Sequence, residues 1–518
     1  MGGAGWLGYR DHRRPGVQRP LEQQPVPAVR LDPRHPEPVV PRGMIAEQFC
    51  WQPWCTARTV PCVPSRWSRE VILRACSWWR IAVGGLRYRG WVVARLLGLV
   101  LGSLCVFPVA AAVASTPSAR VDACPSAVRG LGTVVFAPGG QLQVLRLSSC
   151  SVRDLHQGGV FELSVSPDGL WIAFTRLGAT SLSGPYVISI NGGKVYTPLG
   201  TNLEDWSWGT HGHVLYGVSS EGTLIAQAPS GKRRTIPLPG SSLGVSPTGN
   251  LLAVSNSKCG IFPSPATGEL DTITLSSGAR KLVLHRNSAF FVFANWSPDQ
   301  KWLLFWHEQI CSASLQDDGM PLQAVAASGG PPVPIVPVTL VYKDYLTWCT
   351  NRLIAVEGSG RQSNLDKSLV AASPPTWHVV TVVQSRKRSW VSPACSPNGS
   401  VLAAAAGPNQ TGRTPTPPRR SIWLLAPNGS GLRRLTNPPS NAFTDESPQW
   451  STNGQWIMFL RAKLTANSSA VSGGTIELVK AKGAAELISI LTFTGSVYDF
   501  YDHLSWPNIS GWHQPPHE

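Results

Sequence analysis

The sequence predicts an all-β fold, a β-propeller of eight four-stranded blades, with seven as the alternative count. Three observations predict it. A turn followed by a short apolar strand recurs along most of the chain, about every 48 residues. Glycine and proline are abundant, with 50 and 45 in 518 residues, as turns between short strands require. The two ends of the repeat region carry complementary fragments of one further unit.

The repeated turn has the form Ser-Pro-Asp-Gly, and each position has its own task. Proline fixes φ, Asp or Asn accepts a hydrogen bond from its own backbone, and glycine takes the left-handed position. The apolar strand after each turn is expected to be buried between neighbouring sheets. Clear copies begin at Ser166, Ser246, Ser297, Ser396 and Ser451, and degenerate copies lie near Ser207 and Thr347.

The acidic turn positions have a second interpretation, in which they ring the channel and bind a cation or another ligand. Asn398 and Asn453 stand where Asp168 and Asp299 stand in other copies, and both residue types make the same turn bond. We therefore expect a structural role in the turn. The residues concerned are Asp168, Gly169, Gly249, Asp299, Asn398, Gly399, Asn453 and Gly454.

Each turn unit is followed by a second hairpin, so one repeat contains strands a, b, c and d. Residues 506–512 resemble a strand a with its turn and have no strand b after them. Residues 133–137, 142–147 and 151–155 resemble strands b, c and d without a strand a before them. We expect the C-terminal strand to complete the N-terminal blade, which closes the ring and hides both sheet edges.

These blocks resemble TolB-type propeller repeats, which are relatives of the WD-type repeats. The resemblance covers residues 131–512 and is strongest in the copies near 166, 297, 396 and 451. It implies a propeller fold. The α/β domain that TolB itself carries has no counterpart in the short segment between the apolar run and the first strand.

Three further segments are expected before the repeats. Residues 1–86 are rich in Pro and Arg and are expected to lack regular structure, or to lie upstream of the true start. Residues 87–114 combine a basic flank with an uncharged run, 96–114, and residues 115–130 form a linker. The repeats then fill 131–512, and residues 513–518 are a tail.

The uncharged run predicts export. It ends in Ala112-Val113-Ala114, a small-residue pattern typical of signal-peptide cleavage before Ser115. The same run is long enough for an uncleaved membrane anchor, which would be the chain's one contact with a membrane. In both cases the basic flank stays in the cytoplasm and residues 115–518 are exported.

Six of the 11 cysteines follow the cleavage point. An even number in an exported chain permits up to three disulfides. Cys259 and Cys311 follow equivalent strands of neighbouring repeats and are our first expectation for a pair, with free buried thiols as the alternative. No C-x-x-C pair remains in this set, so a zinc site is not expected.

Neither the charge pattern nor the motifs predict nucleic-acid binding or catalysis. The net charge of +16 is concentrated in the head, and later basic runs such as 232–234 are short. The segment 240–244 fits G-x-S-x-G, but it opens a repeat and has no hydrolase domain after it. No catalytic, cofactor-binding or metal-ligating residue is assigned.

The sequence thus favours an exported, non-catalytic propeller that binds a protein, peptide or glycan across one face of the ring. One alternative is a propeller enzyme, a lactonase, lyase or hydrolase, with its site at the channel mouth. The other alternative is the ectodomain of a membrane-anchored sensor.

Overall fold

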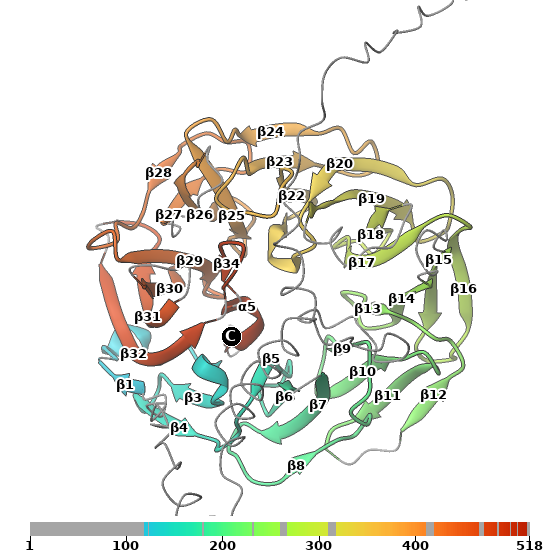
Figure 1. Ribbon diagram of the computed structural model, residues 1–518, viewed down its shortest axis with the longest axis horizontal. Coiled ribbons are helices and arrows are strands. Elements are labelled where there is room, and N and C mark those ends of the chain that lie inside the picture. Colours follow the sequence, from blue (N-terminus) through green and yellow to red (C-terminus); the bar gives the residue numbers. More distant parts are fainter. Residues whose placement is uncertain are drawn as a thin grey trace, which may run out of the picture. The chain divides into compact units, whose positions relative to one another are not determined.

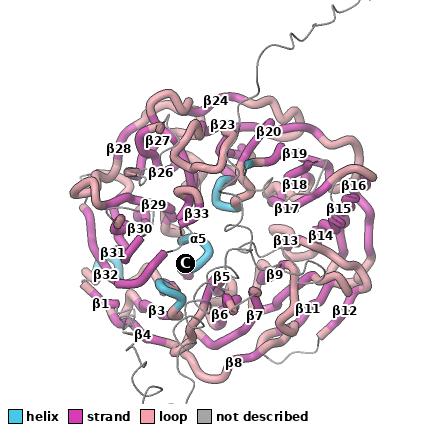
Figure 2. The backbone as a smooth tube through the Cα atoms, in the orientation of Figure 1, coloured by secondary structure: helices cyan, strands magenta, loops and turns pink. Residues whose placement is uncertain are grey.

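The computed structural model describes residues 119–122, 124–178, 181–229, 233–258, 267–308, 318–410, 419–465, 471–483, 486–497, 499–504 and 506–514. Within this part of the chain, eight sheets are arranged in a ring, each with its first strand innermost (Figures 1 and 2). The expected eight-bladed propeller is confirmed, and the alternative count of seven is wrong.

Blades 2 to 4 follow one another along the chain, and blade 1 combines three strands near the start of the repeats with the C-terminal strand. Blade 1 contains β35 (Ser510–His513), β2 (Thr133–Phe136), β3 (Gln143–Arg146) and β4 (Ser151–Asp154). Blade 2 contains β5 (Val160–Val165), β6 (Trp171–Leu177), β7 (Leu182–Ser189) and β8 (Val195–Tyr196). Blade 3 contains β9 (Asp205–Trp208), β10 (Val214–Val218), β11 (Thr223–Gln227) and β12 (Arg234–Ile236). Blade 4 contains β13 (Ser242–Val245), β14 (Leu251–Lys258), β15 (Thr267–Thr274) and β16 (Arg280–Arg286).

The remaining four blades complete the ring. Blade 5 contains β17 (Phe290–Trp296), β18 (Trp302–Glu308), β19 (Met320–Ala326) and β20 (Val333–Thr339). Blade 6 contains β21 (Leu346–Cys349), β22 (Arg352–Glu357), β23 (Ser368–Ala372) and β24 (Val380–Val383). Blade 7 contains β25 (Arg388–Cys395), β26 (Leu402–Pro408), β27 (Ser421–Leu425) and β28 (Arg433–Arg434). Blade 8 contains β29 (Phe443–Trp450), β30 (Trp456–Leu464), β31 (Val471–Lys480) and β32 (Leu487–Val497).

A few short elements lie outside this scheme. A fifth strand, β1 (Ala119–Val121), joins the outer edge of blade 8, although the sequence predicted a linker there. The helical turns are α3 (Ser126–Arg129), α5 (Trp506–Ile509), η1 (Pro138–Gly140) and η2 (Lys343–Tyr345). The strands β33 (Asp499–Phe500) and β34 (His503–Leu504) form a small hairpin.

The ring closes as expected, by pairing of β35 with β2. The register differs from the prediction that residue 506 begins the closing strand. Trp512 pairs with Val134, the second residue of its strand b, as Trp296 pairs with Leu303 in blade 5. Trp506 lies in α5 and stacks on Phe493, with ring centroids 5.5 Å apart. The two tryptophans have the spacing of a repeat, but only the second one is in strand a.

The core consists of apolar layers between adjacent blades. The strands that follow the turns are almost fully buried, such as β30, because both faces of each sheet are covered. Tryptophans at the ends of three inner strands also join neighbouring blades through indole hydrogen bonds. Trp208 donates to the Ser164 carbonyl, Trp296 to that of Gly244 and Trp450 to that of Ala394, at 2.9–3.0 Å.

The repeated turns have the geometry that their sequence predicts. Asp168 Oδ1 accepts hydrogen bonds from Ser166 Oγ (2.6 Å) and from the Leu170 amide (3.1 Å). Asp299, Asn398 and Asn453 make the same pair of bonds in their copies. The turn glycines 169, 249, 399 and 454 have φ between 65° and 74°.

Two disulfides fix the described cysteines. Cys124–Cys150 ties the segment after β1 to the β3–β4 turn, and Cys349–Cys395 joins the ends of the inner strands of blades 6 and 7. The expected Cys259–Cys311 pair lies outside the described residues, and so does the predicted export signal. The helices that the structure describes are four residues long or shorter, and none meets the length and apolarity that a membrane crossing needs.

Candidate functional site

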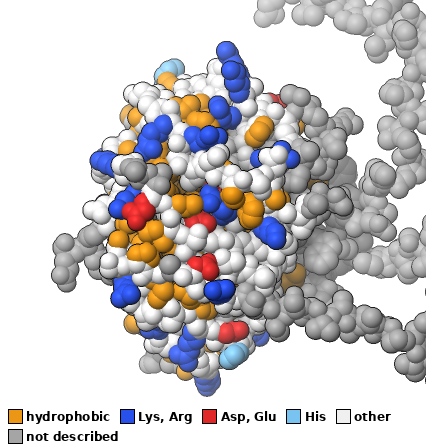
Figure 3. All heavy atoms as spheres, turned by 90° about the vertical axis from the view of Figure 1, so that its left-hand side faces the viewer, with side chains coloured by type: hydrophobic (Ala, Val, Ile, Leu, Met, Phe, Trp, Pro, Cys, Tyr) orange, Lys and Arg blue, Asp and Glu red, His pale blue; other side chains and the backbone are white. Residues whose placement is uncertain are grey.

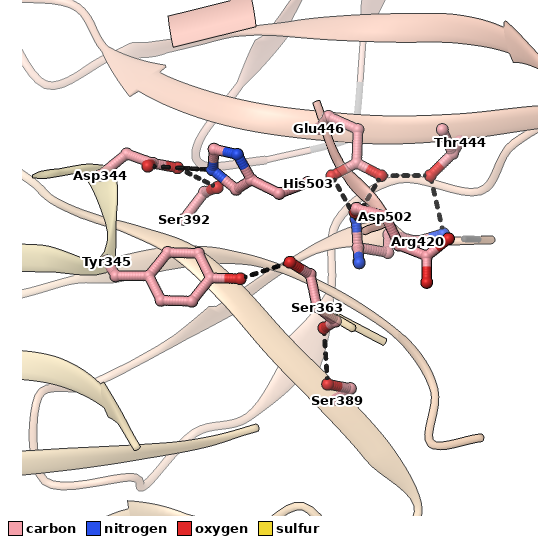
Figure 4. A network of polar contacts seen from close by, with 10 residues as sticks. All are labelled: Asp344, Tyr345, Ser363, Ser389, Ser392, Arg420, Thr444, Glu446, Asp502 and His503. Atoms are coloured by element: carbon pink, nitrogen blue, oxygen red, sulfur yellow. Dashed lines mark hydrogen bonds and ion pairs between the residues drawn. The ribbon is translucent and has the colours of Figure 1, made fainter. Parts of the chain in front are cut away.

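The two faces of the ring differ in how their strands are joined. The turns between strands a and b and between strands c and d lie on one face, which we call the turn face. The connections from b to c and from each blade to the next lie on the other, the long-loop face. Over blades 6, 7 and 8 this second face carries η2, the loop 358–367 and the β33–β34 hairpin. A network of buried polar side chains holds these three segments together (Figure 4).

The first part of the network joins the hairpin to η2. His503 Nε2 lies 3.1 Å from Asp344 Oδ1, and Asp344 Oδ2 accepts a 2.7 Å hydrogen bond from Ser392 Oγ. The Tyr342 ring stacks on the imidazole, with centroids 3.8 Å apart and planes 4° apart. Burial would raise the pKa of the Asp344 carboxyl, but His503 and Ser392 together hold it below its usual range. The carboxylate is therefore ionised at neutral pH and binds both partners.

These three residue types match a hydrolytic triad, but their connections do not. In a triad the serine hydroxyl bonds the imidazole, and the carboxylate orients the other ring nitrogen. Here Ser392 and His503 both bond Asp344, and no hydrogen bond among the described residues joins Ser392 to His503. The arrangement fastens the hairpin to the blade 6 connection and does not activate the serine.

The second part of the network centres on Arg420, which is 1% exposed. Its Nη1 donates to both carboxylate oxygens of Glu446, at 3.0 and 3.1 Å, and to the Asp502 carbonyl at 3.0 Å. Thr444 Oγ1 adds a hydrogen bond to the same carboxylate. Burial raises the pKa of Glu446, and the Arg420 charge opposes that rise. The arginine thus links blades 7 and 8 to the hairpin.

The loop 358–367 is organised around a buried lysine. The Lys367 ammonium is fully buried and donates to the carbonyls of Ser359, Gly360 and Leu365, at 2.8–3.0 Å. Burial lowers its pKa to about 8. The same loop is anchored by Tyr345, whose hydroxyl donates to Ser363 Oγ at 2.7 Å. These bonds fix the conformation of a ten-residue connection between β22 and β23.

Two members of the network keep unused hydrogen-bonding capacity. Both carboxylate oxygens of Asp502 and the Nε and Nη2 atoms of Arg420 are buried and have no hydrogen-bond partner. Asp502 also has a φ of 64°, in the left-handed region. Burial raises the pKa of its carboxyl, against the influence of the Arg420 charge. The ionised Asp502 carboxylate therefore lowers the stability of the β33–β34 hairpin in which it lies.

Above the buried layer lies a more accessible one. Arg361 pairs with Asp318 at 2.6 Å and donates to the Tyr501 hydroxyl at 3.1 Å. Arg386 and Arg419 are exposed on the neighbouring connections of blade 7. Asn364, Ser389 and Gly407 lie beside Arg419 at this surface. This layer presents charged and hydroxyl groups on loops that the buried network fixes.

The turn residues predicted from the sequence lie on the turn face, whereas the network lies on the long-loop face. Asp168 has a second contact there: its Oδ2 lies 2.6 Å from His213 Nδ1. Ser242 of the G-x-S-x-G match lies within β13, where its buried hydroxyl is 2.5 Å from Ser255 Oγ. It is not at a strand-to-helix turn, as a hydrolase nucleophile would be. No cluster of three potential metal ligands occurs among the described residues.

Sequence reasoning missed every residue of the network. These residues lie outside the repeated motif, and partners such as Asp344 and His503 are far apart along the chain. One signal was present: between the end of β32 and the closing strand, the chain contains more residues than the connections between other blades. That extra length forms the β33–β34 hairpin and α5.

Comparisons with known proteins give the fold alone. No protein-family model and no curated protein matches the sequence. Similar solved structures include the eukaryotic initiation factor, with a TM-score of 0.46, 13% identity and coverage of 77% of this chain and 91% of that one. They also include the putative TolB of Agrobacterium tumefaciens, with a TM-score of 0.30, 13% identity and coverage of 70% of this chain and 90% of that one. TolB of Acinetobacter baumannii has a TM-score of 0.33 and 13% identity, with coverage of 62% of this chain and 67% of that one. The expected likeness to TolB-type propellers is thus found among solved structures.

Proposed function

We propose that this protein is an exported propeller that binds a protein, peptide or glycan on its long-loop face, over blades 6 to 8. The buried network carries the proposal. Lys367, Arg420 and Asp344 fix the conformations of three connections. Flexible connections would lose conformational entropy when a ligand binds, so connections that are already fixed favour binding. Rigid loops with exposed charged groups are a common basis of recognition on a stable scaffold.

Two observations support the remaining parts of the proposal. The disulfides Cys124–Cys150 and Cys349–Cys395 are typical of an oxidising compartment, outside the cytoplasm. The bonds of Ser392 and His503 to one carboxylate favour a binding role over hydrolysis at this site. Whether the apolar run 96–114 is cleaved or retained decides between a released protein and an anchored sensor. Amino-terminal sequencing of the exported protein tests this, because cleavage leaves Ser115 first.

Matched charge reversals on the two faces test the binding surface. The first variant combines Arg386→Glu and Arg419→Glu on the long-loop face, and the second combines Lys194→Glu and Lys301→Glu on the turn face. All four residues are exposed, and both variants change the net charge equally. Immobilised wild-type protein and both variants are compared for capture of exported proteins and glycans from the native source.

We expect the long-loop variant to lose the ligands that the wild-type protein and the turn-face variant retain. The same capture by all three proteins, or loss in the turn-face variant alone, would contradict the proposed surface.

A further inference from the structure

The outer edges of the eight blades are protected in different ways. A sheet edge with free backbone groups can pair with another strand, so proteins shorten, interrupt or cover such edges. Five outer strands are only two to four residues long: β4, β8, β12, β24 and β28. The seven-residue β20 contains Pro334 and Pro337, which lack the amide hydrogen. The eleven-residue β32 is covered by β1.

The remaining outer strand, β16, is seven residues long and contains no proline. It pairs with β15 on its inner side, and none of the described residues pairs with its outer side. A bulge at Val283 divides it into Arg280–Leu282 and Leu284–Arg286. Each part is as long as β1. The pairing of β1 with β32 shows that three residues suffice for an added strand on this propeller.

The side chains of β16 make this edge basic. Arg280 is neutralised by Asp271 (2.7 Å) and Glu269 (3.2 Å), whereas Lys281 and Arg286 have no acidic partner among the described residues. The neighbouring blade adds Arg234, which reaches the turn before β16 and donates to the Leu275 carbonyl at 3.0 Å. Leu282, 49% exposed, lies on the opposite face of the strand from Lys281 and Arg286. The edge therefore offers backbone pairing, positive charge and one apolar contact.

The rest of the outer surface is also basic, but it offers no comparable edge. Among the described residues, 18 Lys and Arg are exposed against 7 Asp and Glu. Figure 3, which faces the side of the ring with β28 and β32, shows blue side chains scattered among few red ones. On that side the basic strand β28 has two residues and β32 is already covered. Charge alone therefore does not distinguish β16; the combination with a free edge does.

We propose that the outer edge of blade 4 binds an extended acidic segment of a partner protein by strand addition to β16. The segment would pair with the free backbone groups, place its carboxylates near Lys281 and Arg286 on one face of the strand, and cover Leu282 on the other. The chain's own β1 provides the precedent for this geometry on blade 8. This surface is separate from the long-loop face, so it is independent of the function proposed above.

A labelled peptide of alternating glutamate and valine, nine residues long, tests the proposal with the purified protein in fluorescence anisotropy. We expect saturable binding, about tenfold weaker for the Lys281→Glu/Arg286→Glu variant, because two attractive contacts become repulsive. The Arg433→Glu/Arg434→Glu variant on β28 carries the same charge change and should bind within about twofold of wild type.

A second peptide separates strand pairing from attraction of charge. It has the same sequence, N-methylated at every residue, so that it keeps its carboxylates and has no backbone donors. We expect no binding of this peptide. Equal binding of both peptides would show recognition of charge alone, as for an anionic glycan, and would overturn the proposal. A third outcome is that the unmethylated peptide does not bind and the Lys281→Glu/Arg286→Glu variant self-associates. This outcome would show that the charges only protect the edge, and it would also overturn the proposal.

Discussion

Gly511 in β35, the last strand of the chain, pairs with Val135 in β2, which lies beside it in blade 1. β35 also contains Trp512, whose indole donates a hydrogen bond to the Leu131 carbonyl at 2.7 Å. Gln514, just beyond it, bonds the Thr452 amide at 2.7 Å and the Trp450 carbonyl at 3.1 Å. The last residues of the chain thus join blade 1 to blade 8 and close the propeller.

Removal of residues 510–514 should abolish cooperative folding, because blade 1 loses its inner strand and its contacts with blade 8. Circular dichroism during heating, together with size-exclusion chromatography, would show a broad transition and association through the open edge. Trp512→Phe is the control, since it removes one hydrogen bond and should cost about 1 kcal/mol with a sharp transition. A truncated protein with the wild-type melting curve would refute this account of closure.

The turn glycines differ in what surrounds them, which gives a matched pair of substitutions. A Cβ at Gly399 would meet the Thr350 hydroxyl of the preceding blade, whereas at Gly454 the nearest atom, Pro397 Cδ, is 3.7 Å away. Both have positive φ, 72° and 65°. Gly454→Ala should cost about 1 kcal/mol, for the left-handed backbone alone. Gly399→Ala should cost more, about 2–3 kcal/mol, because the turns must also separate.

Urea denaturation of both variants would measure these two costs. Equal values would mean that the contact between adjacent turns contributes nothing beyond the backbone conformation.

Two carboxyl groups in the network should respond to pH in opposite ways. The pKa of Asp344 is lowered, so its contribution to stability is present above the ordinary carboxyl pKa and is lost as the pH falls through the lowered value. The pKa of Asp502 is raised, so its contribution is full below the ordinary pKa and is lost as the pH rises through the raised value.

Asn substitutions at these two positions should therefore have opposite effects at pH 7. Asp344→Asn should destabilise the protein by about 1–3 kcal/mol, and the difference from wild type should shrink as the pH falls toward 3. Asp502→Asn should stabilise it by about 1 kcal/mol, and this gain should shrink toward pH 4. Chemical denaturation between pH 3 and 8 would measure both profiles. Destabilisation by Asp502→Asn at pH 7 would show that the carboxylate has a favourable role with Arg420.

The disulfide between blades 6 and 7 should stabilise the ring. Replacing Cys349 and Cys395 by serine should cost about 2–4 kcal/mol, because the cross-link restricts the unfolded chain across a separation of 46 residues. The melting temperature would measure the cost, and adding a reductant to the wild-type protein should lower it as well. Alkylation of unreduced protein followed by mass spectrometry should leave both cysteines unlabelled. Labelled thiols would refute the bond and weaken the argument for export.

The candidate site shows why a repeat can be predicted more easily than its exceptions. The turn of Ser166 and Asp168 recurs because its hydrogen bonds join residues two to five positions apart. The Arg420–Asp502 contact joins residues that no local pattern relates. The misplacement of the closing strand has a similar origin: Trp506 and Trp512 have the spacing of a repeat, and only packing on Phe493 shows that the first belongs to a helical turn.

By itself, the sequence determined the fold class, the number of blades and the closure of the ring. These follow from turn chemistry and hydrophobic patterning, which act between near neighbours and are repeated along the chain. The tertiary structure alone decided which polar residues are buried together on the long-loop face, which cysteines of the described part are bonded, and which outer edge is left open. Those features depend on contacts between distant segments, and the free energy of such contacts is set by burial and geometry that arise only when the ring is assembled.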